Sequence, residues 1–523
     1  MIRLIPEPRL CIRGEGSYTL AEMPKIKSDF SLPLLEGRAE LCDDADFVIT
    51  ENSDIAEEGY RLCVKPDSIK VEASREIGAY YALQTLRKIG GIDLGYREIP
   101  CCEIEDEPRY KWRGLQIDDS RHFFGEKQIK KMLDLMFLEK LNVFHWHLTD
   151  DQGWRIEIKK YPLLTEIGSK RKSSQTGGWK SFKIEKKEHS GFYTQEQIKD
   201  IVEYAKARGI MVVPEIDFPA HCASAIACYK ELACREIETE VPGYFGGIIP
   251  QWKQFNWKWN RTVCLGKEST FAFIYNVLDE ICELFDAPYL HMGGDEAPQN
   301  EWKACEKCQA VMKQNGLKNE SELQGWFENR ISEYLKAKGK KLIAWNDVLS
   351  ADNLNKEDKN IVIQYWTPER DEKAEAYVNS GGDAILSNHQ CFYFDMTYAQ
   401  IPLDKTYGYE PEEFGMSAES KGVLGYEGEL WSEWIADSYK LEMNAIPRVQ
   451  ALSEIAWSQK DKINFRDFKH RLDEYKPVLE ALGYVCADDK VALPQSRAMK
   501  KKILKKFFKG NPYLEVEINK GDR

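Results

Sequence analysis

The strongest constraint on the fold is a pattern that recurs eight times between residues 113 and 431: a short apolar run, followed in most repeats by a helical segment. The runs lie at 113–119, 142–148, 209–217, 288–295, 340–345, 360–366, 383–388 and 422–431. Apolar strands that alternate with crossover helices form a parallel sheet, and eight of them can close into a barrel. The sequence therefore predicts an α/β protein whose main unit is a (β/α)8 TIM barrel.

Helical spacing of apolar residues is clear between several of these strands, for example at 126–140 and 194–208. The second helix begins with Thr194 and Gln197 at the spacing of a capping box, and Gly209 follows its end. The segments after the fifth and seventh strands are less regular, so the number of helices there stays open.

Short alternating strands and one amphipathic helix precede the barrel, which is typical of an α+β unit. The strands are predicted at 47–51, 59–65 and 68–74, and the helix at 75–90. Residues 101–110 lack clear periodicity and are predicted to be a linker.

After about residue 460 the chain is helical and charged. The basic stretch 499–509 favours a solvated helix with an apolar side over contact with an anionic surface. We predict three parts: a small non-catalytic α+β domain at 1–105, the catalytic barrel at 106–460 and a helical extension at 461–523.

Charge and cysteine content limit the partners and the compartment. The net charge of −13 disfavours nucleic acid as a partner, and no run of 18 apolar residues predicts a membrane span. The first twenty residues carry prolines and charges where a signal peptide needs an apolar segment, so we expect a cytoplasmic protein with reduced cysteines. Cys305 and Cys308 form the one CxxC motif, and without a second CxxC nearby a packing role is favoured over a metal or redox role.

Acidic and tryptophan residues follow most of the predicted strands. They are Asp118, Asp119, Asp150, Asp151, Glu215, Asp217, Asp295, Glu296, Trp345, Asp347, Trp366, Glu429, Trp431 and Glu433, together with Asn388. A single aspartate after a strand is a common helix cap, but capping does not explain acids at most of the strand ends. Because the carboxyl ends of barrel strands meet on one face, we predict the active site there.

The segment HMGGDEAP places Asp295 and Glu296 directly after two glycines at a strand end. Adjacent residues that leave a strand point in different directions, so these carboxyl groups are not expected to face each other at ~5 Å as an acid and a nucleophile do. One acid could protonate a leaving oxygen while the other holds an internal group of the substrate that attacks. The pattern therefore favours substrate-assisted chemistry.

Three tryptophans at strand ends, Trp345, Trp366 and Trp431, could form the walls of a sugar-sized pocket, because an indole ring packs well on the apolar face of a pyranose. Arg121 follows the first strand, and its forked donors could bridge neighbouring hydroxyl groups.

Five segments carry a resemblance to glycoside hydrolase family 20, the β-N-acetylhexosaminidases. They are RGLQIDDSRHFF (113–124), NVFHWHLTDDQGW (142–154), EIDFPAH (215–221), HMGGDEAP (291–298) and LWSEW (430–434), in the order found in the family. The resemblance covers about 110–460, and the upstream α+β unit resembles the small domain that precedes the barrel in the family.

The resemblance implies an exo-acting, retaining hydrolase that releases terminal β-linked N-acetylglucosamine or N-acetylgalactosamine from a glycan or glycoconjugate, without cofactor or metal. It implies that Glu296 is the general acid and then the base. It implies that Asp295 orients the 2-acetamido group, whose carbonyl oxygen attacks the anomeric carbon to give an oxazolinium ion, and that Tyr393 donates to the same oxygen.

The resemblance also implies the substrate contacts. Asp395 would bind sugar hydroxyls, Arg121 and Glu433 would hold the O3 and O4 side, and Asp150 and His221 would form a network near Glu296. Trp345, Trp366 and Trp431 would enclose the acetamido group and the ring. One departure from the family is that Asn346, rather than an acid, directly follows Trp345, which puts the outer-pocket contacts in doubt.

Several alternatives stay open. The insertion 241–260, with three tryptophans, could extend the pocket or form a surface loop. His145 and His147 form an HxH motif found in metal-dependent amidohydrolases, although a packing role is favoured. A carbohydrate-binding protein on an inactive barrel is a third reading, and a homodimer is left open.

Overall fold

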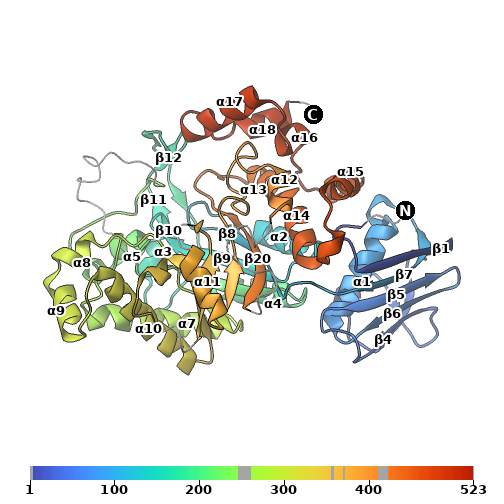
Figure 1. Ribbon diagram of the computed structural model, residues 1–523, viewed down its shortest axis with the longest axis horizontal. Helices are drawn as coiled ribbons and strands as arrows, with labels where there is room; N and C mark the ends of the chain where they lie inside the picture. Colours follow the sequence, from blue (N-terminus) through green and yellow to red (C-terminus); the bar gives the residue numbers. More distant parts are fainter. Residues whose placement is uncertain (1–3, 246–260, 355–358, 369–370, 410–421, 522–523) are drawn as a thin grey trace.

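The computed structural model describes residues 4–245, 261–354, 359–368, 371–409 and 422–521. Figure 1 shows a small sheet domain at the right, a central barrel, and a helical C-terminal region across the top. Trp252, Trp257 and Trp259, the three tryptophans of the insertion 241–260, lie outside the described residues. In the described part, no helix is both long and apolar enough to span a membrane.

The N-terminal domain is a seven-stranded sheet in the order β1-β7-β5-β6-β4-β2-β3. The strands are β1 Leu10–Thr19, β2 Lys25–Ser28, β3 Glu40–Leu41, β4 Phe47–Glu51, β5 Tyr60–Lys65, β6 Ser68–Ala73 and β7 Glu98–Asp106. The helix α1, Glu76–Ile89, packs against β5, β6 and β7, and the turns η1 Pro33–Leu35 and η2 Ile92–Leu94 complete the domain. The three predicted strands and the predicted helix are confirmed.

The predicted linker at 101–110 is wrong, because most of it belongs to β7, which pairs with β1 and β5. Its buried residues Cys102, Ile104 and Asp106 alternate with the exposed Glu103 and Glu105. This period-two pattern was obscured because a buried aspartate occupies one of the inward positions. The strand β1 was also not predicted.

The barrel consists of eight parallel strands, and β8 pairs with both β20 and β9 to close it. The strands are β8 Trp112–Asp118, β9 Val143–Asp150, β15 Met211–Ile216, β16 Tyr289–His291, β17 Lys341–Trp345, β18 Ile361–Tyr365, β19 Ala384–Leu386 and β20 Val423–Leu430. All eight predicted strands, and hence the predicted TIM barrel, are confirmed.

Helices on the outside of the barrel follow most of its strands. They are α2 Glu126–Leu138, α4 Gln195–Lys206, α7 Glu268–Leu284, α10 Glu320–Ala337, α11 Asp371–Asn379, α12 Leu403–Tyr407, α13 Ser438–Ala445 and α14 Arg448–Trp457. The capping box of Thr194 and Gln197 is present at the start of α4. The irregular crossovers lie where the sequence indicated them: β17 is followed by the short turn η4, Asn346–Ser350, and β19 by the five-residue α12.

Insertions after three strands build up the carboxyl end of the barrel. After β9 they are β10 Gly153–Trp154, α3 Leu163–Glu166, β11 Lys170–Arg171, β12 Ser174–Thr176, β13 Lys183–Glu185 and β14 His189–Ser190. After β15 they are α5 Ala223–Cys228 and η3 Lys230–Leu232, and after β16 they are α8 Asn300–Ala304 and α9 Glu306–Gln314.

The interior of the barrel changes from apolar to polar along the strands. Its amino-terminal end is filled by Trp112, Val143, Val213, Ala287, Ile343, Val362 and Ile385. Two residues further along their strands, on the same face, lie polar groups such as His145 and Gln364. His145 Nδ1 and Gln364 Nε2 each lie 2.7 Å from Oε1 of the buried Glu427. The other carboxylate oxygen of Glu427 accepts a hydrogen bond from Trp112 Nε1 at 2.7 Å. This polar layer supports the carboxyl ends of the strands.

The N-terminal sheet is joined to the barrel through the buried Asp106 at the end of β7. Its carboxylate accepts hydrogen bonds from Tyr60 Oη at 2.7 Å, Lys140 Nζ at 2.9 Å and Trp457 Nε1 at 2.9 Å. Lys140 also lies 4.4 Å from the centre of the Trp457 ring. Burial lowers the pKa of Lys140 to about 8 even though Asp106 opposes the shift.

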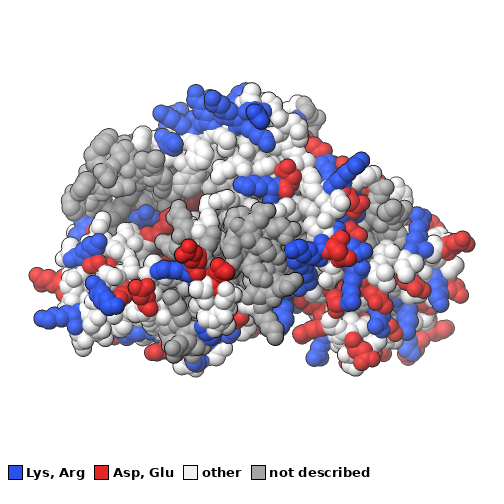
Figure 2. Space-filling model, viewed as in Figure 1, with Lys and Arg blue, Asp and Glu red and all other residues white. Residues whose placement is uncertain are grey.

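The C-terminal region is helical, as predicted, and consists of η7 Lys460–Lys462, α15 Phe465–Ala481, α16 Asp489–Ala492, α17 Arg497–Phe508 and α18 Leu514–Lys520. In α17, Ile503 and Phe507 are buried while the lysines are exposed, and Figure 2 shows the resulting basic patch along the top of the molecule. Phe507 packs in one cluster with Phe245 and Trp434, so α17 borders the segment that carries Glu433. The prediction of a solvated helix with an apolar side is confirmed.

We expect Asp106→Ala to lower the free energy of unfolding by about 3–5 kcal/mol, because it leaves the Lys140 ammonium buried without its anion. Urea-induced unfolding followed by tryptophan fluorescence measures the change. Glu105→Ala, at the adjacent exposed position of β7, is the matched control and should change the stability by less than ~1 kcal/mol. Equal effects of the two substitutions would contradict the assigned role of Asp106.

Candidate active site

The two glycines after β16 allow the strand to turn sharply at the mouth of the barrel. Gly293 and Gly294 have φ values of 67° and 89°, and a Cβ atom on Gly293 would lie 1.9 Å from Asp217 Oδ1. Gln324 Nε2 donates to the carbonyl oxygen of Gly294 at 2.7 Å and fixes the turn. Only glycine fits at position 293, and the turn delivers the next two residues to the face of the barrel.

Asp295 and Glu296 occupy different environments. The side chain of Asp295 is 18% exposed, and that of Glu296 is 59% exposed. His221 Nε2 lies 3.6 Å from Asp295 Oδ2 and 3.8 Å from Glu296 Oε2, so one imidazole ring faces both carboxyl groups. Burial raises the pKa of Asp295 to about 7; His221 opposes this shift, while Asp347 and Glu296 add to it.

A buried chain of charges supports His221. Asp150 Oδ1 lies 3.3 Å from His221 Nδ1, and Asp150 Oδ2 pairs with Arg121 Nη2 at 2.6 Å. Burial lowers the pKa of His221, but Asp150 and Asp295 overcome that effect and raise it to about 9. His221 therefore carries a positive charge beside the two acids at neutral pH.

Aromatic side chains form one wall of the site. The rings of Trp345 and Trp431 have centres 5.7 Å apart, and Trp366 stacks on Tyr393 with centres 6.0 Å apart and an interplanar angle of 15°. The Tyr393 and Trp431 rings are 6.2 Å apart, which joins the two pairs. Burial, with Glu429 and Asp295 nearby, raises the pKa of Tyr393 well above its usual value, so its hydroxyl stays a neutral donor.

Hydrogen bonds fix the orientation of two of these indoles. Trp345 Nε1 donates to Glu215 Oε1 at 2.9 Å, and Trp366 Nε1 donates to Asp347 Oδ2 at 2.7 Å. Asn346 is fully buried and donates to the carbonyl oxygen of Thr367 at 2.9 Å. The residue that directly follows Trp345 is therefore structural, and the acid missing there is supplied one position later by Asp347.

A second set of side chains, here called the charged wall, consists of ionisable groups with spare hydrogen-bonding capacity. Arg121 Nη2 lies 3.9 Å from Glu433 Oε1, and its guanidinium lies 5.1 Å from the centre of the Trp431 ring. Asp395 Oδ1 and Glu433 Oε2 are buried, and no described residue forms a hydrogen bond with either atom. Burial raises the pKa of Glu433 to about 7 and that of Asp395 well above its usual value. These oxygens are available to hydroxyl groups of a ligand.

The structure brings ten of the eleven residues predicted from the sequence into one linked set of contacts, and the eleventh, Asp395, interacts electrostatically with Glu433 and Tyr393. The eleven residues are Arg121, Asp150, His221, Asp295, Glu296, Trp345, Trp366, Tyr393, Asp395, Trp431 and Glu433. Arg261 was not predicted: it pairs with Asp151 and its Nη2 lies 3.3 Å from His221 Nδ1. No motif marks Arg261, and its position depends on a contact between distant segments.

The HxH pair is part of the polar interior. Burial lowers the pKa of His145, but Glu427 and Glu215 raise it to about 10. Glu215 and Asp150 likewise raise the pKa of His147 to about 10 against the effect of burial. The ring nitrogens of both histidines face buried carboxylates of the barrel interior, which fits the packing role favoured by the sequence.

Comparison with known proteins agrees with this geometry. Residues 110–460 match the model of the glycosyl hydrolase family 20 catalytic domain, and residues 32–107 match domain 2 of that family. A β-hexosaminidase of Porphyromonas gingivalis is 35% identical over 89% of this chain, which spans 59% of the length of that relative.

Two solved structures are similar over most of the chain. A β-N-acetylhexosaminidase from Bacteroides fragilis is 32% identical, with a TM-score of 0.80 over 92% of this chain and 96% of that one. An exo-β-N-acetylglucosaminidase from Vibrio harveyi in complex with N-acetylglucosamine is 31% identical, with a TM-score of 0.81 over 93% of this chain and 78% of that one. The chain belongs to glycosyl hydrolase family 20.

Proposed function

We propose that the protein is an exo-acting, retaining β-N-acetylhexosaminidase that uses the acetamido group of its substrate as the nucleophile. One observation carries this proposal: Asp295 is largely buried, whereas the adjacent Glu296 is exposed, and His221 faces both carboxyl groups. Two acids in such different environments suit two different parts of one sugar.

Glu296 acts as the general acid and then the general base. Its exposed position suits protonation of the glycosidic oxygen, which faces the leaving group and solvent. As the bond between the anomeric carbon and that oxygen breaks, the acetamido carbonyl oxygen forms a new bond to the anomeric carbon, giving an oxazolinium ion. Water then attacks the anomeric carbon, Glu296 takes its proton, and the acetamido group is released.

Asp295 and Tyr393 position the attacking group. The Asp295 carboxylate accepts the acetamido N–H and stabilises the positive charge that develops on the nitrogen, while the neutral Tyr393 hydroxyl donates to the carbonyl oxygen. Trp345, Trp366 and Trp431 surround the methyl group and the apolar ring face. Asp295 Oδ1 is buried, and no described residue forms a hydrogen bond with it, which supports its role as an acceptor for the substrate.

The charged wall binds the other side of the terminal sugar. The unpaired oxygens of Asp395 and Glu433 accept hydroxyl hydrogens, and Arg121 donates to the hydroxyl oxygens. A ligand without the matching hydroxyl group would leave such a carboxylate oxygen buried and unpaired, which is costly. The site therefore strongly prefers a ligand that carries this hydroxyl group. The relative in complex with N-acetylglucosamine supports a terminal N-acetylhexosamine as the substrate.

We expect Glu296→Gln to lower kcat by about 10²–10⁴-fold on a natural disaccharide, because the leaving oxygen loses its proton donor. The loss should be smaller on p-nitrophenyl β-N-acetylglucosaminide and galactosaminide, because p-nitrophenolate leaves without protonation. Steady-state rates on both substrate types test this, with Glu283→Gln on the exposed side of α7 as the matched control. Equal losses on the two substrate types would contradict the acid role.

Sugar binding without turnover by the unmodified protein would favour the carbohydrate-binding alternative.

Asp295→Asn should lower kcat by at least ~10²-fold with little change in KM, because the carboxylate acts mainly on charge that develops in the transition state. Since burial raises the pKa of Asp295 to about 7, its carboxylate is lost as the pH falls through that value, and kcat/KM of the unmodified protein should fall with it. In Asp295→Asn, the fall of kcat/KM at acidic pH should become weaker. Glu433→Gln should mainly raise KM. A thiazoline analogue of the cyclised intermediate should inhibit the unmodified protein strongly. An unchanged pH profile in Asp295→Asn would contradict this assignment.

A further inference from the structure

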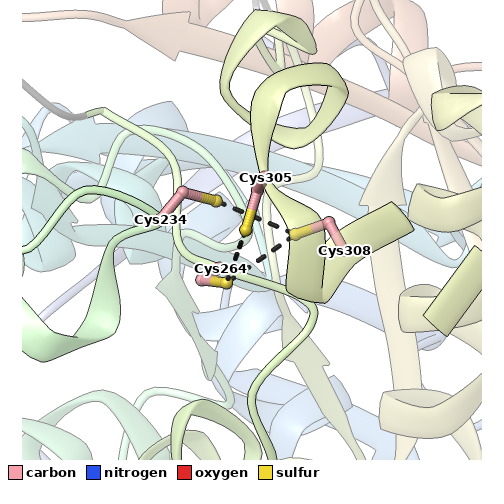
Figure 3. Close-up of side chains that lie close together, drawn as sticks. All are labelled: Cys234, Cys264, Cys305 and Cys308. Carbon is pink, nitrogen blue, oxygen red and sulfur yellow. Dashed lines mark hydrogen bonds between the residues drawn. The ribbon is translucent and has the colours of Figure 1, made fainter. Parts of the chain in front are cut away.

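Four cysteines from three separate segments meet beside the barrel (Figure 3). Cys234 follows η3, Cys264 precedes α7, and Cys305 and Cys308 lie at the start of α9. Their sulfur atoms are 3.8 Å apart for Cys234 and Cys308, 3.7 Å for Cys264 and Cys305, and 3.7 Å for Cys264 and Cys308. The sequence has no second CxxC motif, but Cys234 and Cys264, from two separate segments, complete the set of four thiols.

These separations fit a tetrahedron of sulfur atoms around one metal ion. A zinc–sulfur bond of about 2.3 Å places the sulfurs of a tetrahedral site ~3.8 Å apart, whereas a disulfide needs ~2.05 Å. We propose that Cys234, Cys264, Cys305 and Cys308 bind a structural zinc ion. Four thiolates leave no open coordination position, so the site holds the chain together and takes no part in hydrolysis.

The backbone around the cluster holds the four thiols in place. Cys264 N donates to the carbonyl oxygen of Leu232 at 2.7 Å, and Ala233 forms a short bridge with Val263, so the segments of Cys234 and Cys264 run side by side. Gly266 lies against the start of α9, where a Cβ atom would be 2.3 Å from the carbonyl carbon of Lys307.

The cluster is largely shielded from solvent and lies at the N-terminus of a helix. Cys264 and Cys308 are fully buried, and Cys305 is 9% exposed. The N-terminus of α9, where Cys305 and Cys308 lie, favours negative charge.

The proposed zinc links two loops that carry active-site residues. The segment with Cys234 and Cys264 continues the loop after β15, which holds His221, and Arg261 is three residues before Cys264. The pair Cys305 and Cys308 follows the loop after β16, which holds Asp295 and Glu296. Trp302 Nε1 donates to the carbonyl oxygen of Val263 at 2.9 Å and strengthens the same junction. The metal therefore ties together the two loops on which the acids and their histidine depend.

Metal analysis of the full chain, purified under reducing conditions without chelator, tests the proposal. We expect about one zinc ion per chain, lost from the double variant Cys305→Ser/Cys308→Ser and retained in Cys282→Ser, a cysteine of α7 outside the cluster. Because the double variant can fail to fold, a second measurement uses the unmodified protein: a mercurial that modifies thiols should release zinc to a chromogenic chelator. Cobalt(II) in place of zinc should give intense sulfur-to-metal charge-transfer bands.

Four results would overturn the proposal, and three of them concern the unmodified protein. They are less than about one tenth of a zinc ion per chain after growth with added zinc, iron in place of zinc, or peptide mapping of the protein as isolated that shows these four cysteines joined in two disulfides. Retention of zinc by a folded Cys305→Ser/Cys308→Ser variant would also overturn it. None of these measurements depends on glycosidase activity, so the outcome is independent of the proposed function.

Discussion

The geometry of the candidate site depends on a set of charges buried inside the barrel. Glu215 at the end of β15 pairs with His147 and accepts a hydrogen bond from Trp345 Nε1. His147 also contacts Asp150, which pairs with Arg121 and His221. Removing one member leaves another charge buried alone, at a cost of several kcal/mol, so each side chain has essentially one acceptable position. The buried charges of the barrel interior therefore fix the positions of the active-site groups.

The sequence allowed prediction of the barrel because its strands are almost wholly apolar at their amino-terminal ends and carry acids at their carboxyl ends. The rule that these ends converge pointed to the acids and tryptophans at the strand ends, whereas His221, Tyr393 and Asp395 were implied only by the resemblance to the family. The prediction from apolar alternation failed for β7, because Asp106, which pairs with Lys140 and Trp457, interrupts the alternation. Arg261 and the cysteine cluster were also beyond reach, because both are defined only by contacts between loops.

The departure at Asn346 illustrates how a local sequence comparison can mislead. Position 346 is buried against Thr367, so a carboxylate there would have no room to reach the pocket. The short turn η4 places Asp347 toward Trp366 instead, where it holds the indole that stacks on Tyr393. The function of an acid at this corner depends on which way the turn directs it, and that direction is set by packing against β18.

The loops after β15 and β16 explain why an additional anchor is useful in this barrel. A side chain that must discriminate between a ground state and a transition state has to be held within a fraction of an ångström. Both loops contain only short helices, and each departs from the barrel for more than twenty residues before α7 or α10 resumes the regular pattern. A metal bound by both loops restricts them with few residues, because each metal–thiolate bond replaces many weak contacts. The buried charges fix the inner ends of these loops, and the four cysteines fix their outer ends.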